Sequence, residues 1–250
     1  MTENKLIVKR RKKRVIKRLA IFFSFFIGLL ITLCLKLPVF NISNIIVKNN
    51  DIITDEKIVE NSGITLGTNM FFFSTKEVEN RLLLNPYIKK VHISRRIPNV
   101  IIINVEERNT AYLYTKGDNQ FILDENGVVL EANRDSKKGS LVEISGMDLK
   151  VVDLGEQIAP IDEKDLKFLK EFKELLIRAK EQLPINKIDF SEKYNLRVYY
   201  NQVAIRLGDT KELEKKMNYA INIIKSQGLE GKKAEVNVTN LETPTFSITS

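Results

Sequence analysis

The side chains that could do chemistry are few, and their spacing matches no common catalytic motif. His92 is the only histidine and Cys34 the only cysteine of the 250 residues. A Ser-His-Asp triad would therefore depend on His92, which falls on the polar face of an expected strand. No intramolecular disulfide can form, and no Gly-x-Ser-x-Gly, His-Glu-x-x-His or Cys-x-x-Cys string occurs. Nucleophilic catalysis is thus disfavoured.

Acidic and glycine-containing segments give no site either. Asp124-Glu125-Asn126-Gly127 begins like a calcium loop but lacks its remaining ligands. Glu106 and Glu107 are consecutive, so a strand would point them to opposite faces and they could not act as an acid/base pair. Gly228 to Lys232 lacks the spacing of a phosphate-binding loop. The sequence predicts a protein that is not an enzyme and uses no cofactor or metal.

The most informative feature is a charge-free apolar run from Leu19 to Leu35 that follows a basic tail. The first eighteen residues hold nine Lys or Arg and one acid, so they carry the whole net charge of +8. Seventeen helical residues span about 25 Å, close to the bilayer core of about 30 Å. Because Lys and Arg stay cytoplasmic, a single-pass type II topology is expected, with the bulk of the chain outside. The residues expected to set this topology are Arg10, Arg11, Lys12, Lys13 and Arg14.

Two alternatives compete for this N-terminal segment. A cleaved signal peptide would have a shorter apolar core followed by small residues, whereas Lys36-Leu37-Pro38-Val39-Phe40 follows here. Specific nucleic-acid binding would need more than a basic tail, which lacks interleaved aromatic residues. Loose attraction to anionic membrane lipid is the expected additional role of these charges.

After the span, about seventy residues alternate between strand and helix patterns. The expected elements are a strand at 42–47, a helix from Thr54 to Gly63, a helix from Ser74 to Asn85, and strands at 90–94 and 100–106. Val78, Leu82 and Leu83 are expected on one side of the second helix. In the last strand Ile101, Ile103 and Val105 share the face turned toward the helices. The fold class is therefore α+β, with two helices on a three-stranded sheet.

The next block is expected to be mostly β with two helices. Its predicted elements are hairpins at 121–130 and 196–207, amphipathic helices at Asp162–Gln182 and Asp209–Ser226, and a final strand at Ala234–Thr239. Residues Leu241 to Ser250 are expected to be a flexible tail. The predicted domains are residues 1–18 (cytoplasmic tail), 19–37 (transmembrane helix), 38–109 (β-α-α-β-β), 110–240 (β domain) and 241–250 (tail).

Several strings, taken in order, carry a family resemblance: Asn85-Pro-Tyr-Ile-Lys-Lys-Val, Arg95-Arg-Ile-Pro-Asn with Val105-Glu-Glu-Arg, and Asp124-Glu-Asn-Gly. With the basic tail and single span, they make the chain resemble the bacterial division protein family FtsQ/DivIB. That resemblance implies that residues 38–109 form a POTRA (polypeptide-transport-associated) domain and that the β domain follows it.

The resemblance also implies a function. Members of this family act as scaffolds at the division septum, bind the single-span proteins FtsB/DivIC and FtsL, and link them to septal peptidoglycan synthesis. The end of the β domain offers a strand edge to the FtsB/DivIC partner. Carried onto this chain, the partner-binding residues are Glu235, Val236, Asn237, Val238 and Thr239.

Two other functions remain open from the sequence. A POTRA-containing transport or assembly factor of the cell envelope would need many further alternating strands for a membrane barrel, and the remaining residues instead include two long helices. An anchored cell-wall hydrolase would need the catalytic groups that are missing.

Overall fold

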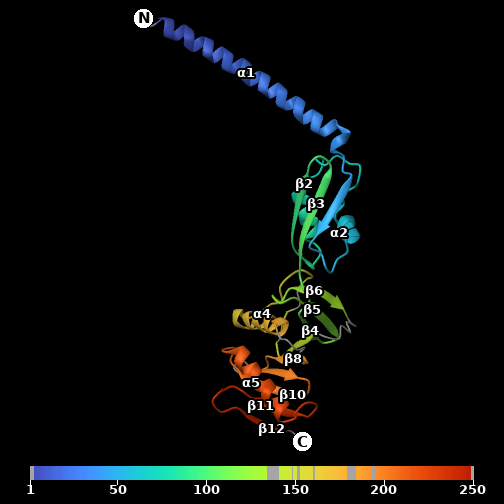
Figure 1. Ribbon diagram of the computed structural model, residues 1–250, viewed down its shortest axis with the longest axis vertical. Helices are drawn as coiled ribbons and strands as arrows, with labels where there is room; N and C mark the ends of the chain where they lie inside the picture. Colours follow the sequence, from blue (N-terminus) through green and yellow to red (C-terminus); the bar gives the residue numbers. More distant parts are fainter. Residues whose placement is uncertain are drawn as a thin grey trace. The chain divides into compact units, whose positions relative to one another are not determined.

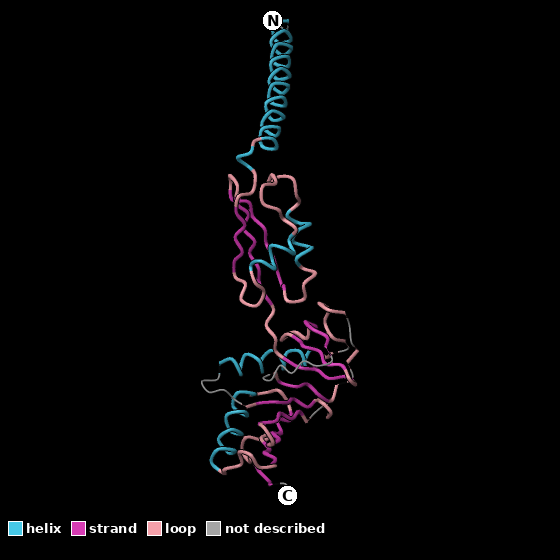
Figure 2. The backbone as a smooth tube through the Cα atoms, turned by 90° about the vertical axis from the view of Figure 1, so that its right-hand side faces the viewer, coloured by secondary structure: helices cyan, strands magenta, loops and turns pink. Residues whose placement is uncertain are grey.

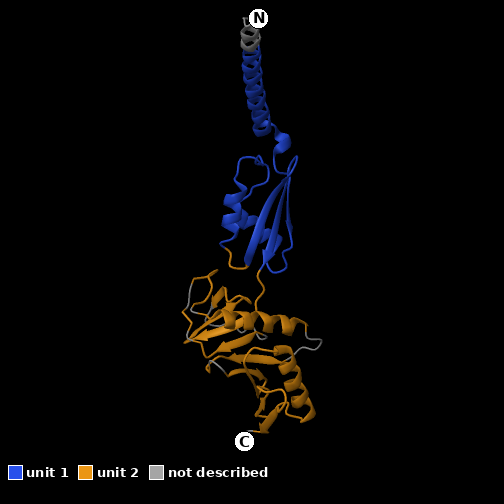
Figure 3. Cartoon of the chain, turned by 90° about the vertical axis from the view of Figure 1, so that its left-hand side faces the viewer, with its two compact units in different colours: residues 1–84, 88–107 blue, residues 85–87, 108–250 orange. Residues whose placement is uncertain are grey.

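The structure is a computed structural model that describes residues 3–133, 141–147, 149–150, 153–159, 161–178, 184–192 and 195–248. The chain divides into two compact units (Figure 3). The first comprises residues 1–84 and 88–107, and the second comprises residues 85–87 and 108–250.

The N-terminal segment is one long helix, α1 (Glu3–Lys36), so the basic tail and the apolar run form a continuous element (Figure 1). Within it, Lys12–Lys36 is long and apolar enough to cross a membrane. The most apolar part of this segment is not buried against the rest of the protein. An apolar helical segment that is not buried in the protein needs another apolar environment, which a bilayer supplies.

The rest of the first unit has the predicted order of strand, two helices and two strands. Its elements are β1 (Asn44–Lys48), α2 (Asp55–Ser62), α3 (Thr75–Leu82), β2 (Ile88–Arg96) and β3 (Val100–Glu107), after a short 3₁₀ turn at Pro38–Phe40. The sheet order is β1-β3-β2; β3 lies parallel to β1 and antiparallel to β2. Figure 2 shows both helices on one face of this sheet.

Local sequence signals explain both helices. Thr54 accepts a hydrogen bond from the Lys57 amide at the start of α2, and Gly63 ends that helix in the left-handed conformation, with φ 66°. Ser74 accepts from the Glu77 amide at the start of α3. The predicted starts of both helices are therefore confirmed.

The core of this unit confirms the predicted strand face, with one correction. Ile101, Ile103 and Val105 are buried beneath the helices, and Val78 and Leu82 of α3 are buried in the same core. The placement of Leu83 on the buried side was wrong. The helix ends at Leu82, and Leu83 follows as an exposed cap residue.

The second unit contains a nine-stranded sheet in the order β12-β11-β10-β9-β8-β7-β4-β5-β6. Its strands are β4 (Tyr112–Lys116), β5 (Asn119–Leu123), β6 (Val129–Asn133), β7 (Val142–Ser145), β8 (Ile185–Asp189), β9 (Leu196–Tyr200), β10 (Val203–Gly208), β11 (Ala234–Asn237) and β12 (Thr245–Ile248). Both predicted hairpins are present, as β5–β6 and β9–β10.

Helices α4 (Glu163–Arg178) and α5 (Leu213–Ser226) cover one face of this sheet (Figure 2). The last turn expected for the first of them, up to Gln182, lies outside the described residues. The stripe predicted on α5 is buried, with Met217, Ala220 and Ile224 each at most 1% exposed. On α4 the deepest residues include Phe168, which the sequence pattern did not single out.

The expectation of a flexible C-terminal tail was wrong for its middle part. Thr245–Ile248 form β12, which pairs antiparallel with β11 at the end of the sheet. Residues 249–250 lie outside the described residues.

Candidate partner-binding edge

Strand β11 is the element that the sequence assigns to partner binding, and its main chain is paired on both sides. It runs parallel to β10, with Val203 opposite Ala234 and Ile205 opposite Val236. On its other side it runs antiparallel to β12, with Val236 opposite Phe246. Of the predicted residues, Glu235, Val236 and Asn237 lie in β11, whereas Val238 and Thr239 follow its end, so the strand is shorter than expected. It is also not an open edge.

The side chains of this segment alternate between core and surface. Ala234, Val236 and Val238 are buried in the core beneath the helices. Glu235 lies on the opposite face, where its carboxylate is 3.3 Å from the Arg206 guanidinium of β10. Because both side chains are about one-third exposed, this ion pair contributes little to stability. Glu235 can therefore give up its contact with Arg206 with little loss of free energy.

The direction of the main-chain groups decides which residues could serve an incoming strand. The Val238 amide donates to the Arg206 carbonyl of β10 at 3.0 Å. Since a residue's main-chain groups point to alternating sides along a strand, Val236 also faces β10, whereas Glu235 and Asn237 face β12. A proline at Val236 or Val238 would therefore damage the sheet itself and would not probe the outer side of β11.

Strand β12 is a thin cover on this outer side. All four of its side chains are exposed, with Phe246 at 45% and Ile248 at 58%. Its only strand neighbour in the described sheet is β11. A short terminal strand that buries no side chain has few contacts to hold it, so local opening costs little free energy.

Sequence reasoning missed a buried lysine beside this end of the sheet. Lys216 of α5 is 4% exposed, and its ammonium donates to the carbonyls of Leu207 at 2.9 Å and Asp209 at 3.0 Å, and to the Asp209 carboxylate. The hydrogen bond from Lys216 is the main cause that lowers the pKa of Asp209. Lys216 follows Leu213 by three residues and precedes Ala220 by four, so it lies on the buried side of α5, and this spacing is the signal that could have revealed it.

The side chains considered for catalysis or metal binding have structural roles or are exposed. His92 is 76% exposed and lies 3.5 Å from the Glu79 carboxylate. Asp124 is buried, binds Arg108 at 2.8 Å and accepts the amides of Asn126 and Val128, so it shapes the β5–β6 turn. Across the described part of the chain, no three His, Cys, Asp or Glu side chains gather as a metal site would require.

The paired glutamates at the end of β3 separate as predicted. Glu106 lies near Lys89 and Lys90, at 2.9 and 3.0 Å. Glu107 accepts three consecutive amides, from Asp51 to Ile53, at 2.7–2.9 Å. Glu106 therefore makes surface ion pairs, whereas Glu107 closes the β1–α2 loop. The two carboxylates do not form an acid/base pair.

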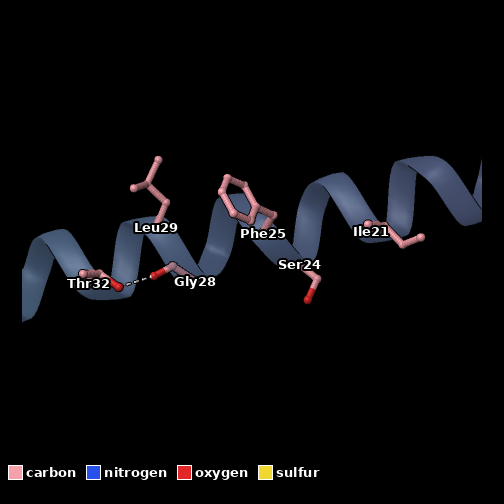
Figure 4. A pocket seen from close by; sticks show the side chains of 6 residues that line it. All are labelled: Ile21, Ser24, Phe25, Gly28, Leu29 and Thr32. Atoms are coloured by element: carbon pink, nitrogen blue, oxygen red, sulfur yellow. Dashed lines mark hydrogen bonds between the residues drawn. The ribbon is translucent and has the colours of Figure 1, made fainter.

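The residues assigned to topology lie on α1. Arg10 and Arg11 fall within the helix, and the side chains of Lys12, Lys13 and Arg14 are exposed. Further along, one face of the span is shallowly hollowed where small side chains follow each other at four-residue intervals, at Ser24, Gly28 and Thr32 (Figure 4). The Thr32 hydroxyl donates to the Gly28 carbonyl at 2.8 Å, so it is satisfied within the helix.

Comparison with known proteins identifies the family. Residues 40–108 match the POTRA domain, FtsQ-type, and residues 111–241 match the C-terminal domain of cell division protein FtsQ/DivIB. The chain belongs to the FtsQ/DivIB family. It is 38% identical over 246 residues to cell division protein DivIB of Clostridium acetobutylicum, which covers 98% of each chain. It is 36% identical over 249 residues to DivIB of Clostridium botulinum strain Hall, covering 99% of this chain and 96% of the relative.

Family membership gives the chain a role in cell division and confirms the POTRA and β domains of the predicted fold. FtsQ/DivIB is a scaffold-type family and not a known enzyme family. A more distant relative, DivIB of Bacillus subtilis, is 33% identical over 126 residues, about half of each chain.

Proposed function

We propose that this protein is a non-enzymatic, membrane-anchored scaffold of the division machinery. Its N-terminus lies in the cytoplasm and residues 38–250 lie outside, at the division septum. There the β domain binds an FtsB/DivIC-like single-span protein, together with an FtsL-like one, and helps couple septum formation to septal peptidoglycan synthesis.

The observation that carries the proposal is the thin cover on β11. A strand of the FtsB/DivIC-like partner takes the place of β12 and pairs with the outer main-chain groups of Glu235 and Asn237. Such strand addition draws its affinity from main-chain hydrogen bonds and its specificity from side chains at alternate positions. The partner-binding residues remain Glu235, Val236, Asn237, Val238 and Thr239, with the valines acting from the core to hold the strand in place.

The extent of the family match supports this choice of strand. The C-terminal family domain ends at residue 241, before β12 begins at Thr245. A partner site shared within the family should lie inside the shared domain, and β11 does. Displacing β12 exposes little new apolar surface, because its side chains are already exposed.

The proposal is tested by pull-down of the partner's outer region with three variants of residues 38–250. Deleting 241–250 should leave binding equal or stronger, because β12 competes with the partner strand. Deleting 234–250 should abolish binding, because β11 is lost. Circular dichroism and melting temperature establish which variants are still folded.

Phe246→Pro separates this arrangement from its nearest rival, in which the partner adds to the outer side of β12. Phe246 lies opposite Val236, whose main-chain groups point toward β10, so the main-chain groups of Phe246 point away from β11. Proline at position 246 would therefore remove only an N–H on the outer side of β12. We expect unchanged binding. Loss of binding in both Phe246→Pro and the 241–250 deletion would place the partner on β12 and refute the displacement.

A further inference from the structure

The POTRA domain is tied to the end of α1 through one buried side chain. Asn69 is 5% exposed, and its side-chain amide donates to the carbonyls of Cys34 at 2.9 Å and Leu35 at 3.2 Å, the last turn of the helix. Next to it, the Met70 amide donates to the Phe40 carbonyl at 3.0 Å. The loop that contains Asn69 therefore lies where the membrane span ends.

The β2–β3 turn is joined to the same end of the domain. The Ser43 amide donates to the Asn99 carbonyl at 2.9 Å. The Arg95 guanidinium donates to the carbonyls of Met70 and Phe73, both at 2.7 Å. Three segments, residues 36–43, 64–76 and 94–99, thus form one surface beside the end of the span, which we call the membrane-proximal surface.

Exposed apolar side chains concentrate on this surface. Eight large hydrophobic side chains of residues 37–107 are exposed, and five of them belong to these three segments: Leu37, Val39, Leu66, Phe72 and Ile97. Phe72 is 69% exposed and Ile97 is 68% exposed. A contiguous exposed apolar patch marks an interaction site, whereas single exposed residues do not.

The three segments of this surface are basic, although the exposed Glu77 follows Lys76 directly in the first turn of α3. These segments hold four basic residues, Lys36, Lys76, Arg95 and Arg96, and no Asp or Glu. The opposite ends of the same strands carry both signs, since Glu106 of β3 lies beside Lys89 and Lys90 of β2. Apolar side chains rimmed by Lys and Arg are the composition of segments that lie in the interface of a membrane containing anionic lipid.

We propose that the membrane-proximal surface binds the outer leaflet of the bilayer. Leu66, Phe72 and Ile97 enter the boundary between headgroups and acyl chains, and Arg96 and Lys76 contact anionic headgroups. The POTRA domain is then held at the membrane by a second contact, besides the span. This inference rests on two parts of the proposed function, the insertion of α1 in the bilayer and its orientation with residues 38–250 outside.

The test uses the absence of tryptophan from the chain, which makes any introduced tryptophan a single probe. Full-length Phe72→Trp is reconstituted in vesicles of phosphatidylcholine and phosphatidylglycerol whose acyl chains carry bromine near the headgroup. Bromine quenches tryptophan fluorescence only at close range. Phe26→Trp, near the middle of the span, is the positive control, and it is measured in vesicles whose acyl chains carry bromine near their terminal methyl groups. Leu84→Trp, exposed just after α3, is the matched control on the same domain.

We expect quenching of Phe72→Trp by at least half of that seen for Phe26→Trp, and no quenching of Leu84→Trp. Adding Arg96→Glu to Phe72→Trp should reduce its quenching at least twofold. Circular dichroism would show that each variant is folded.

Each other result overturns a distinct claim. If Phe26→Trp is quenched while Phe72→Trp behaves like Leu84→Trp, the surface does not enter the membrane and serves a protein partner or none. If Phe26→Trp is not quenched, α1 does not span the bilayer and the anchor itself is wrong. Partner binding in the pull-down is independent of both results.

Discussion

Glu107 is expected to hold the β1–α2 loop of the POTRA domain closed. Its carboxylate accepts the amides of Asp51, Ile52 and Ile53 at 2.8, 2.7 and 2.9 Å. Hydrogen bonds to a charged acceptor contribute about 1.5–3 kcal/mol each, and less where water can replace them. Because these amides are partly accessible, we expect Glu107→Ala to destabilise the closed loop by about 3 kcal/mol. Glu107→Gln retains one oxygen acceptor and should cost about half as much.

The assay is amide hydrogen exchange of residues 38–250 at neutral pH. About 3 kcal/mol corresponds to roughly a 150-fold faster exchange at Asp51, Ile52 and Ile53 if they exchange through loop opening. The matched control is Glu106→Ala, one residue earlier, which removes only exposed ion pairs with Lys89 and Lys90 and should leave these amides unchanged. Equal exchange in the Glu106 and Glu107 variants would refute this reasoning.

Three further outcomes are expected. Ile103→Asp places an unpaired carboxylate in the POTRA core and should lower the free energy of unfolding by several kcal/mol. Asn104→Asp, on the opposite face of β3, should change the free energy of unfolding by less than about 1 kcal/mol. Equal midpoints of urea unfolding for the two variants would contradict the assigned strand register. The pKa of Asp209 is lowered by Lys216, so the pair stabilises the fold above about pH 4 and this stabilisation is lost as the pH falls further. Asp209→Asn should therefore melt lower than the unchanged protein at pH 6, with the gap narrowing toward pH 3, and a gap independent of pH would exclude this role. Neutral residues at positions 10–14 should lower the fraction of chains with residues 38–250 outside, measured by protease protection; an unchanged fraction would mean that other charges set the topology.

Much of the fold could be predicted because its local signals are strong. Caps at Thr54, Gly63 and Ser74 define the POTRA helices, and the alternation of Ile101, Ile103 and Val105 defines a strand buried on one face. These features depend on near neighbours in the sequence. Strands β4, β7 and β8 were not predicted, because each has only four or five residues, and an alternation that short, such as that of β7, does not stand out from its surroundings.

The candidate site was predicted only in part, because it depends on long-range pairing. The alternation of Ala234, Val236 and Val238 predicts a strand with one buried face, and the structure confirms it. That alternation does not reveal which strands lie on either side. The pairing of Thr245–Ile248 with β11 leaves no such signal, since its side chains are all exposed. Lys216 was missed because its burial depends on carbonyls brought together by the end of β10.

The displacement of β12 by the partner is tested most directly by locking β12 in place. Residues 38–250 contain no cysteine, so Ala234→Cys with Ile248→Cys introduces a single pair. These residues lie opposite each other on β11 and β12. The two residues form a non-hydrogen-bonded pair of the antiparallel ladder, in which neither main chain bonds to the other. The Cα atoms of such a pair are about 4.5 Å apart, a distance at which a disulfide can form. If the partner replaces β12, the oxidised protein should bind the partner's outer region at least tenfold more weakly, and reduction should restore the affinity. Equal affinity in the oxidised and reduced states would contradict the displacement and place the partner elsewhere.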